Sequence, residues 1–141
     1  MIRKFSILLA GTAVGLTAAA CETAATDEPD GVASFADDPR LGERADRICF
    51  TSQIDGFGQA TDRTIVVEAG VNEHYLIETF GYCPNLDWAQ SIRFDAFSSC
   101  LTRGDSLIPY ETLFASDYSG LAAPRACLIS SIHEWNPDAD G

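Results

Sequence analysis

Four cysteines spread along the second part of the chain constrain its fold more than any other feature. They are Cys49, Cys83, Cys100 and Cys127. No two of them have the C-x-x-C spacing of a thioredoxin-like redox motif or a zinc knuckle, which favours structural disulfides over redox or metal chemistry. In a small exported domain, four cysteines predict two disulfides with three possible connectivities. We expect Cys83–Cys100, which closes a short loop, and Cys49–Cys127, which joins the first strand to the last.

The N-terminal segment indicates export, the condition under which such disulfides form. Basic residues Arg3 and Lys4 precede an apolar run over 5–20 that ends in small residues. This layout is typical of a secretory signal peptide, and the run is too short for a comfortable membrane span of about 20 residues. We therefore expect residues 1–20 to be a signal peptide and the protein to be exported to the periplasm.

Cys21 directly follows this segment and raises two possibilities for processing. Small residues before Cys21 resemble a bacterial lipobox, whereas Ala18 and Ala20 also satisfy ordinary signal peptidase. The acidic stretch that follows suits a disordered tether, so we expect a lipidated Cys21, an acidic flexible tether over 21–44 and a membrane anchor facing the periplasm. By analogy with enteric retention signals, Glu22 favours the outer membrane. The alternative is a soluble periplasmic protein with a spare thiol at Cys21.

The charge balance excludes several classes of function. The 141 residues include 21 acidic and 9 basic side chains, for a net charge of −12. Such a surface repels nucleic acids and anionic lipid headgroups, so we expect no nucleic-acid partner and membrane attachment through the lipid alone. Lys4 is the only lysine, which leaves the exported chain without P-loop or Schiff-base chemistry. We expect no cofactor.

Short alternating segments predict a mainly β domain. The pattern indicates a small antiparallel sheet or open barrel of about six strands with short helical turns, braced by two disulfides. The clearest element is a hairpin of 63–68 with 74–80, because Ile65, Val66 and Val67 favour a strand. The domain is expected over 45–136, before a polar tail at 137–141. The expected strands are 47–54, 63–68, 74–80, 91–97, 105–109 and 126–133, with a helical turn at 86–90 and a loop at 110–124.

Several short motifs are similar to those of a known family. They are Asp62-Arg63-Thr64-Ile65, Cys83-Pro84-x-Leu86, Cys100 followed by Asp105 and Ile108, and Cys127-x-Ile129-x-x-Ile132. Together they resemble a family of small proteobacterial envelope proteins, often lipoproteins, classed as domain of unknown function 6491. The resemblance covers about residues 45–135 and implies export and paired cysteines. It implies no catalytic residue, because the family has no assigned activity.

Few residues suggest chemistry. His74 and His133, with Glu73, Glu134 or Asp95, are the residues that could bind a metal or act in acid–base catalysis, but nothing in their spacing brings them together. We therefore assign no catalytic residue and no metal ligand. A possible binding patch consists of aromatic residues at positions where the pattern predicts exposure or a loop: Phe97, Tyr110, Phe114 and Tyr118.

These observations favour a cell-envelope lipoprotein whose domain is a non-enzymatic binding or structural accessory. Its partner is expected to be another envelope protein. The alternative is a small periplasmic enzyme or metal-binding protein that uses His74 or His133 with nearby carboxylates.

Overall fold

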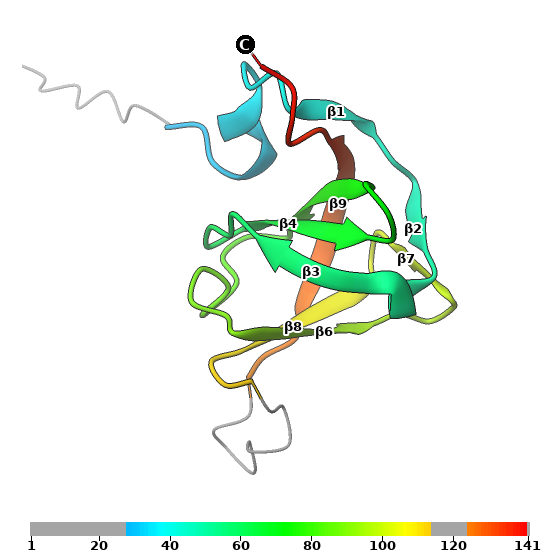
Figure 1. Ribbon diagram of the computed structural model, residues 1–141. Coiled ribbons are helices and arrows are strands. Elements are labelled where there is room, and N and C mark those ends of the chain that lie inside the picture. Colours follow the sequence, from blue (N-terminus) through cyan, green and yellow to red (C-terminus); the bar gives the residue numbers. More distant parts are fainter. Residues whose placement is uncertain (1–27, 114–123, 141) are drawn as a thin grey trace, which may run out of the picture.

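The computed structural model describes residues 28–113 and 124–140, and this part of the chain is mainly β (Figure 1). The predicted fold class is confirmed: the strands form a curled antiparallel sheet with short 3-10 turns and two disulfides. The elements are η1 (Gly31–Phe35), β1 (Leu41–Arg44), β2 (Arg47–Cys49), η2 (Thr51–Gln53), β3 (Ile54–Gly58), β4 (Thr64–Ala69), β5 (His74–Thr79), β6 (Ser91–Asp95), β7 (Cys100–Thr102), β8 (Ser106–Tyr110) and β9 (Cys127–Trp135).

The central hairpin of the sheet is the one that the sequence predicts. Strands β4 and β5 pair from Thr64 opposite Glu78 to Glu68 opposite His74. The turn between them contains Gly70, with φ of 76°, a left-handed conformation that glycine adopts without steric cost. The β-branched residues of β4 are buried on both faces of the sheet, which explains the continuous apolar run in the sequence.

The sheet is organised around its last strand. Its order is β3-β4-β5-β9-β8-β6, and β1 also pairs with β9. One edge of β9 pairs with β5 along most of its length. The other edge pairs with β8 at Leu128 and Cys127, and with β1 at Trp135 and His133. Strand β9 therefore changes partner part-way along this second edge.

The main hydrophobic core lies on one face of the sheet. Residues of β4, β5 and β9 that share this face are almost fully buried, as at Ile65, Ile77 and Ile129. Strand β2 and strand β7 form a separate two-stranded ribbon that adds Ile48 and Leu101 to the same cluster. Burial of apolar area by these side chains is the main favourable term in folding.

The disulfide connectivity that we expected is wrong. The bridges are Cys49–Cys100 and Cys83–Cys127, not Cys83–Cys100 and Cys49–Cys127. Cys49 and Cys100 are opposite one another in the β2–β7 ladder, so that bridge staples the ribbon to itself. The second bridge is in the main core, where it fixes the loop after β5 to the first residue of β9. Strand pairing between distant segments, and not loop length, decides which sulfurs meet.

The folded domain begins earlier than the sequence suggests. Residues 31–44, which we assigned to the flexible tether, include η1 and β1, and both pack against the sheet. The predicted first strand, 47–54, divides into β2, the short turn η2 and the start of β3. Strand β3 continues through residues 55–58, beyond the predicted strand, and β7 was not predicted as a strand. No helix in the described part of the chain is long and apolar enough to cross a membrane.

We expect both disulfides to contribute strongly to stability. They join residues 51 and 44 positions apart, and restriction of the unfolded chain over such loops stabilises by about 4 kcal/mol each in the chain-entropy model. Replacing Cys83 and Cys127 by Ala together should be the more damaging change, because Cys83 is fully buried and a cavity term is added.

Urea unfolding of the two double variants measures these losses. The Cys49→Ala/Cys100→Ala pair is the matched control, with a loop of similar length outside the deepest core. Peptide mapping without reduction checks the connectivity itself, and a Cys83–Cys100 fragment would contradict it.

Candidate functional site

An N-terminal arm, residues 28–40, covers part of the opposite face of the sheet. Val66, Leu76 and Trp135 are buried there beneath Val32 and Phe35. The ring of Phe35 meets Trp135 edge-on, with 5.6 Å between the ring centres, a favourable aromatic geometry. The arm therefore forms a second, small hydrophobic cluster that hides one end of this face and leaves the rest of it open.

Arg40 closes the arm over the same indole. Its guanidinium carbon lies 4.8 Å from the centre of the Trp135 ring. The Arg40 side chain also donates to both carboxylate oxygens of Asp38, at 2.9 and 2.6 Å. These side-chain hydrogen bonds, together with one from the Arg40 backbone N–H, lower the pKa of Asp38 from 3.8 to about 2. Because the Asp38 carboxylate stays ionised down to low pH, it holds the Arg40 guanidinium against the indole of Trp135.

The carboxylate of Glu78 fastens the arm to the sheet. One oxygen accepts a hydrogen bond from the Val32 backbone N–H at 3.0 Å. The other accepts from the hydroxyls of Ser130 and Ser131, at 3.1 and 3.0 Å. Gly31 has φ of 61°, and a Cβ there would lie 2.0 Å from the Glu78 oxygen. The chain therefore needs glycine at this position for the arm to approach Glu78 so closely.

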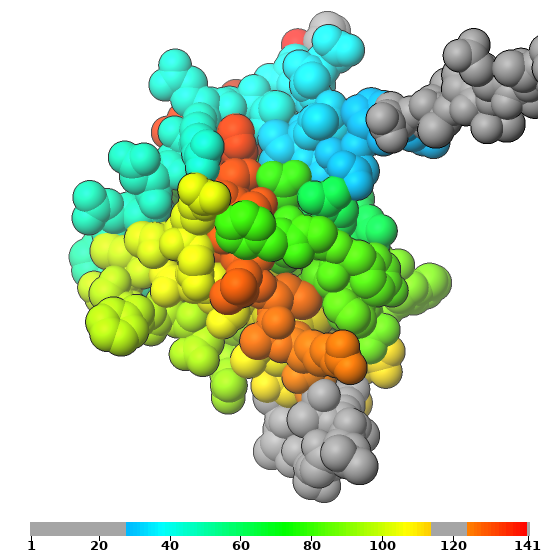
Figure 2. Space-filling model, turned by 180° about the vertical axis from the view of Figure 1, so that it is seen from behind, coloured from blue at the N-terminus to red at the C-terminus, as the bar shows by residue number. Residues whose placement is uncertain are grey.

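Next to Glu78 lies a pocket of about 430 Å³, which we call the arginine pocket. It opens where β9 changes its partner from β8 to β1, and both Arg44 from the end of β1 and Arg103 from the β7–β8 turn line it. Figure 2 views the molecule from the side on which β9, in orange to red, runs beside the yellow β7–β8 segment. The lining residues are Val32, Ala33, Arg44, Glu78, Phe80, Arg103, Ser130, Ser131 and His133.

A smaller cavity adjoins the arginine pocket. It has a volume of about 160 Å³ and shares Arg44, Arg103 and Ser131 with its neighbour. Asp46 also lines it. Among the described residues the ion pairs are Arg40–Asp38 and Arg63–Asp30, so neither arginine of the pocket is held by a carboxylate. The two cavities together place two arginines without an ion pair among the described residues at one concave site.

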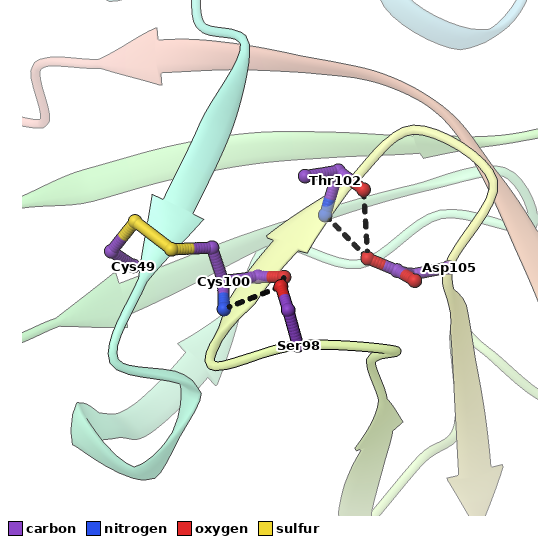
Figure 3. Close-up of a disulfide and its surroundings, with 5 residues drawn as sticks. All are labelled: Cys49, Ser98, Cys100, Thr102 and Asp105. Carbon is purple, nitrogen blue, oxygen red and sulfur yellow. Dashed lines mark hydrogen bonds between the residues drawn. A yellow bond between two sulfur atoms is a disulfide. The ribbon is translucent and has the colours of Figure 1, made fainter.

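The turn that carries Arg103 is braced by Asp105 (Figure 3). The Asp105 carboxylate accepts hydrogen bonds from the Thr102 N–H at 2.7 Å and from the Thr102 hydroxyl at 2.9 Å. It also accepts one from the Phe97 N–H at 3.2 Å. Desolvation raises the pKa of Asp105, but these hydrogen bonds outweigh it and leave the pKa below its ordinary value. The neighbouring Cys49–Cys100 bridge fixes the other end of β7.

The two histidines are on one face of the sheet but in different pockets. His133 is opposite Leu76 in the ladder and lines the arginine pocket. His74 is opposite Trp135 and lines a cavity of about 210 Å³ with Glu73 and Glu134. Its Nδ1 atom is buried and has no hydrogen-bond partner among the described residues. Asp95 lies on β6 and lines neither pocket.

We next consider whether these side chains are placed to bind a metal ion. Within residues 28–113 and 124–140, no group of three or more His, Cys, Asp and Glu side chains is placed to hold a metal ion. The Tyr75 hydroxyl next to this region has a raised pKa, caused by desolvation and then by the charges of Glu73 and Glu134. Such acidic surroundings make the His74 side of the sheet unlike the arginine pocket.

The predicted aromatic patch is not assembled by the described residues. Phe97 is fully exposed, but Tyr110 is only 7% exposed, because β8 directs it inward. Phe114 and Tyr118 lie outside the described residues. A different apolar surface exists beside the arginine pocket, where a cavity of about 390 Å³ is lined by Phe80, Tyr82, Pro84, Arg125, Ala126, Cys127 and Leu128.

A family model described as a family of unknown function, DUF6491, matches residues 3–140. The chain belongs to the DUF6491 family. The resemblance drawn from the sequence is thereby confirmed, over a longer range than the motifs cover. No curated protein and no solved structure matches the chain.

The motifs that indicated the DUF6491 family have structural roles. Thr64, Leu86 and Ile129 are fully buried, and Cys83 and Cys127 form a disulfide. These positions support the fold, and none of them lines the arginine pocket. Family membership therefore accounts for the scaffold and leaves the pocket to be interpreted from its own geometry.

Sequence reasoning missed most of the arginine pocket. Of its lining residues, only His133 was a candidate. Arg44 lay in a segment interpreted as a tether, and Arg103 in a loop without a motif. One signal was available: Glu78 and Ser130 each directly follow a pair of apolar residues in their strands, which indicates a face that is not wholly covered.

We predict that Glu78→Ala loosens the N-terminal arm without unfolding the sheet. The variant removes the acceptor for Val32 and both serine hydroxyls, so the free energy of opening the arm should fall by about 1–3 kcal/mol. Hydrogen exchange at the Val32 amide measures this opening. Glu73→Ala, an exposed carboxylate in the β4–β5 turn, is the control. Unchanged protection of Val32 in the Glu78 variant would show that the clamp contributes nothing.

We predict that Asp105→Asn destabilises the β7–β8 turn in a pH-dependent manner. Hydrogen bonding favours the charged carboxylate in the folded state, so its contribution is present above the unfolded-state pKa and is lost as the pH falls through the folded-state pKa. At neutral pH the variant should lose about 1–2 kcal/mol of unfolding free energy.

Chemical denaturation at several pH values tests this dependence. The deficit relative to the parent should shrink in acid, where the parent also carries a neutral side chain. Asp87→Asn, an exposed carboxylate in another loop, should show no such convergence. A deficit that does not change with pH would rule out the charged carboxylate as its source.

Proposed function

We propose that this member of the DUF6491 family is an exported lipoprotein of the cell envelope. In this proposal residues 1–20 are removed, Cys21 carries the lipid, and the chain after it leads to the β domain. The observation that carries the proposal is the disulfide pattern: all four cysteines after Cys21 are paired. Two such bridges suit an oxidising compartment, and Cys21 remains as the thiol for acylation. The outer membrane is the favoured location.

The domain itself is proposed to act as a non-enzymatic binding accessory. Its open pockets supply hydrogen-bond donors and apolar walls. The serine hydroxyls in one of them are bonded to Glu78, whose other oxygen holds the arm at Val32, so we assign these groups a structural role. Another envelope protein is the proposed macromolecular partner. The net charge of −12 disfavours contact with nucleic acids, so the lipid and local surface features are left to determine where the domain binds.

The competing proposal is a small periplasmic enzyme or metal-binding protein that uses His74 or His133. One arrangement favours it: His74 lines a cavity together with Glu73 and Glu134. The two histidines line different pockets, however, so they do not form one site. The metal content of the native protein discriminates between these proposals, because a site at His74 should lose its metal in His74→Ala.

Fractionation and mass spectrometry of the native protein test the export proposal. We expect the mature chain in the membrane fraction, beginning at an acylated Cys21 and holding two disulfides. Cys21→Ser should move the protein to the soluble periplasmic fraction with its disulfides intact. Four free thiols together with an uncleaved Met1 leader would overturn export. A soluble parent protein with both disulfides would overturn only the lipid anchor.

A further inference from the structure

We infer that the arginine pocket binds a small molecule in which an oxyanion, carboxylate or phosphate, is attached to an aromatic or apolar group. The inference rests on the proposed binding role and names the ligand class for it. Neither the family nor any motif points to such a ligand. The support comes from two arginines without ion pairs, from strand register and from the adjoining wall of apolar side chains.

The first argument is the unpaired positive charge. Arg44 and Arg103 line both connected cavities, and neither forms an ion pair with a described residue. Asp46 shares the smaller cavity with them without such a contact. Among the described arginines, Arg44 and Arg103 are distinguished by lining the same two cavities. Two left unpaired at one concave site provide fork-like donors suited to a carboxylate or phosphate.

The second argument is the register of β1 and β9. Arg44 is directly opposite His133 in this ladder, and both residues line the pocket. Side chains directly opposite one another in a ladder lie on the same face of the sheet and close together. An anion between them would accept hydrogen bonds from both the guanidinium and the imidazole. The register of β1 on β9 therefore places nitrogen donors from two strands beside one pocket.

Glu78 does not occupy the place of that anion. Both of its oxygens are engaged, one by the Val32 N–H and the other by the hydroxyls of Ser130 and Ser131. These donors offset part of its charge and hold it against the pocket wall. The two arginines and the His133 imidazole remain as the nitrogen donors available to a ligand in this cavity, and Glu78 is the one carboxylate that lines it; Asp46 lines the smaller cavity.

The third argument is the apolar wall. Phe80 is 54% exposed and supports Arg103, whose guanidinium carbon lies 5.3 Å from the ring centre. Phe80 also lines the neighbouring cavity, where Tyr82 and Leu128 are exposed. The ring therefore joins the arginine pocket to a cavity that presents apolar side chains together with Arg125. A ligand with an anionic head and an aromatic or apolar substituent would contact both.

The charge of the remaining surface selects for a small ligand. A polyanion or an anionic membrane would be repelled by the net charge of −12. A single oxyanion would be exposed mainly to the local field of Arg44 and Arg103. The pocket volume of about 430 Å³ is in the range of small-molecule sites.

Calorimetric titration of the full chain with phenyl phosphate and with inorganic phosphate tests the inference. All variants are purified in the same nonionic detergent, and thermal unfolding shows that each is folded. We expect saturable binding of phenyl phosphate that is tighter than that of phosphate. Arg103→Gln should weaken it by about tenfold to a hundredfold, the loss expected for hydrogen bonds to a charged group.

Two further variants make the result specific. Arg93→Gln removes an exposed arginine of β6 outside the pocket and should leave binding unchanged. Phe80→Ala should lower the affinity for phenyl phosphate toward that for inorganic phosphate. Absence of saturable phenyl phosphate binding, or equal losses in the Arg103 and Arg93 variants, would overturn the inference. Acylation of Cys21 is measured separately, so failure here is distinct from failure of the export proposal.

Discussion

The structure depends on β9 more than on any other strand. This nine-residue strand pairs with β5 along one edge and with both β8 and β1 along the other. Its first residue, Cys127, is bridged to Cys83, which fixes the strand to the loop after β5. Because so much of the sheet pairs through one strand, small irregularities in β9 determine what both faces of the sheet can hold.

The change of partner on β9 also creates the open site. Strands β8 and β1 pair with different parts of β9 and not with each other. Along the stretch of β9 between these two ladders, the Ile132 carbonyl accepts a hydrogen bond from the Ala45 N–H, and the Ile129 carbonyl accepts one from the Gly104 N–H. A bulge in the β5–β9 ladder falls at the same level, between Glu78 and Thr79. Bulges re-aim side chains and interrupt regular packing. Here Ser130 and Ser131 both reach the Glu78 carboxylate, and the arginine pocket opens beside them.

The sequence predicts structure formed by neighbouring segments better than it predicts pairing between segments far apart in the chain. The β4–β5 hairpin was predictable, because β-branched residues and a turn are adjacent in the chain. The disulfide partners were not, because the β2–β7 ladder that brings Cys49 to Cys100 joins segments about fifty residues apart. Strand β1 was not predicted for a similar reason. Its sequence is polar, and it forms a strand because it pairs with an edge of β9.

The candidate site could not be predicted from the sequence because it too depends on pairing between distant segments. Arg44, Glu78, Arg103 and Ser130 belong to four separate segments, and no spacing between them is fixed until the sheet forms. The residues that identify the family are those that build this sheet, such as the paired cysteines and the buried isoleucines of β9. A scaffold of this kind can keep its core while the residues around the partner change on β9 vary. Members of the DUF6491 family can then share one fold and still differ in what they bind.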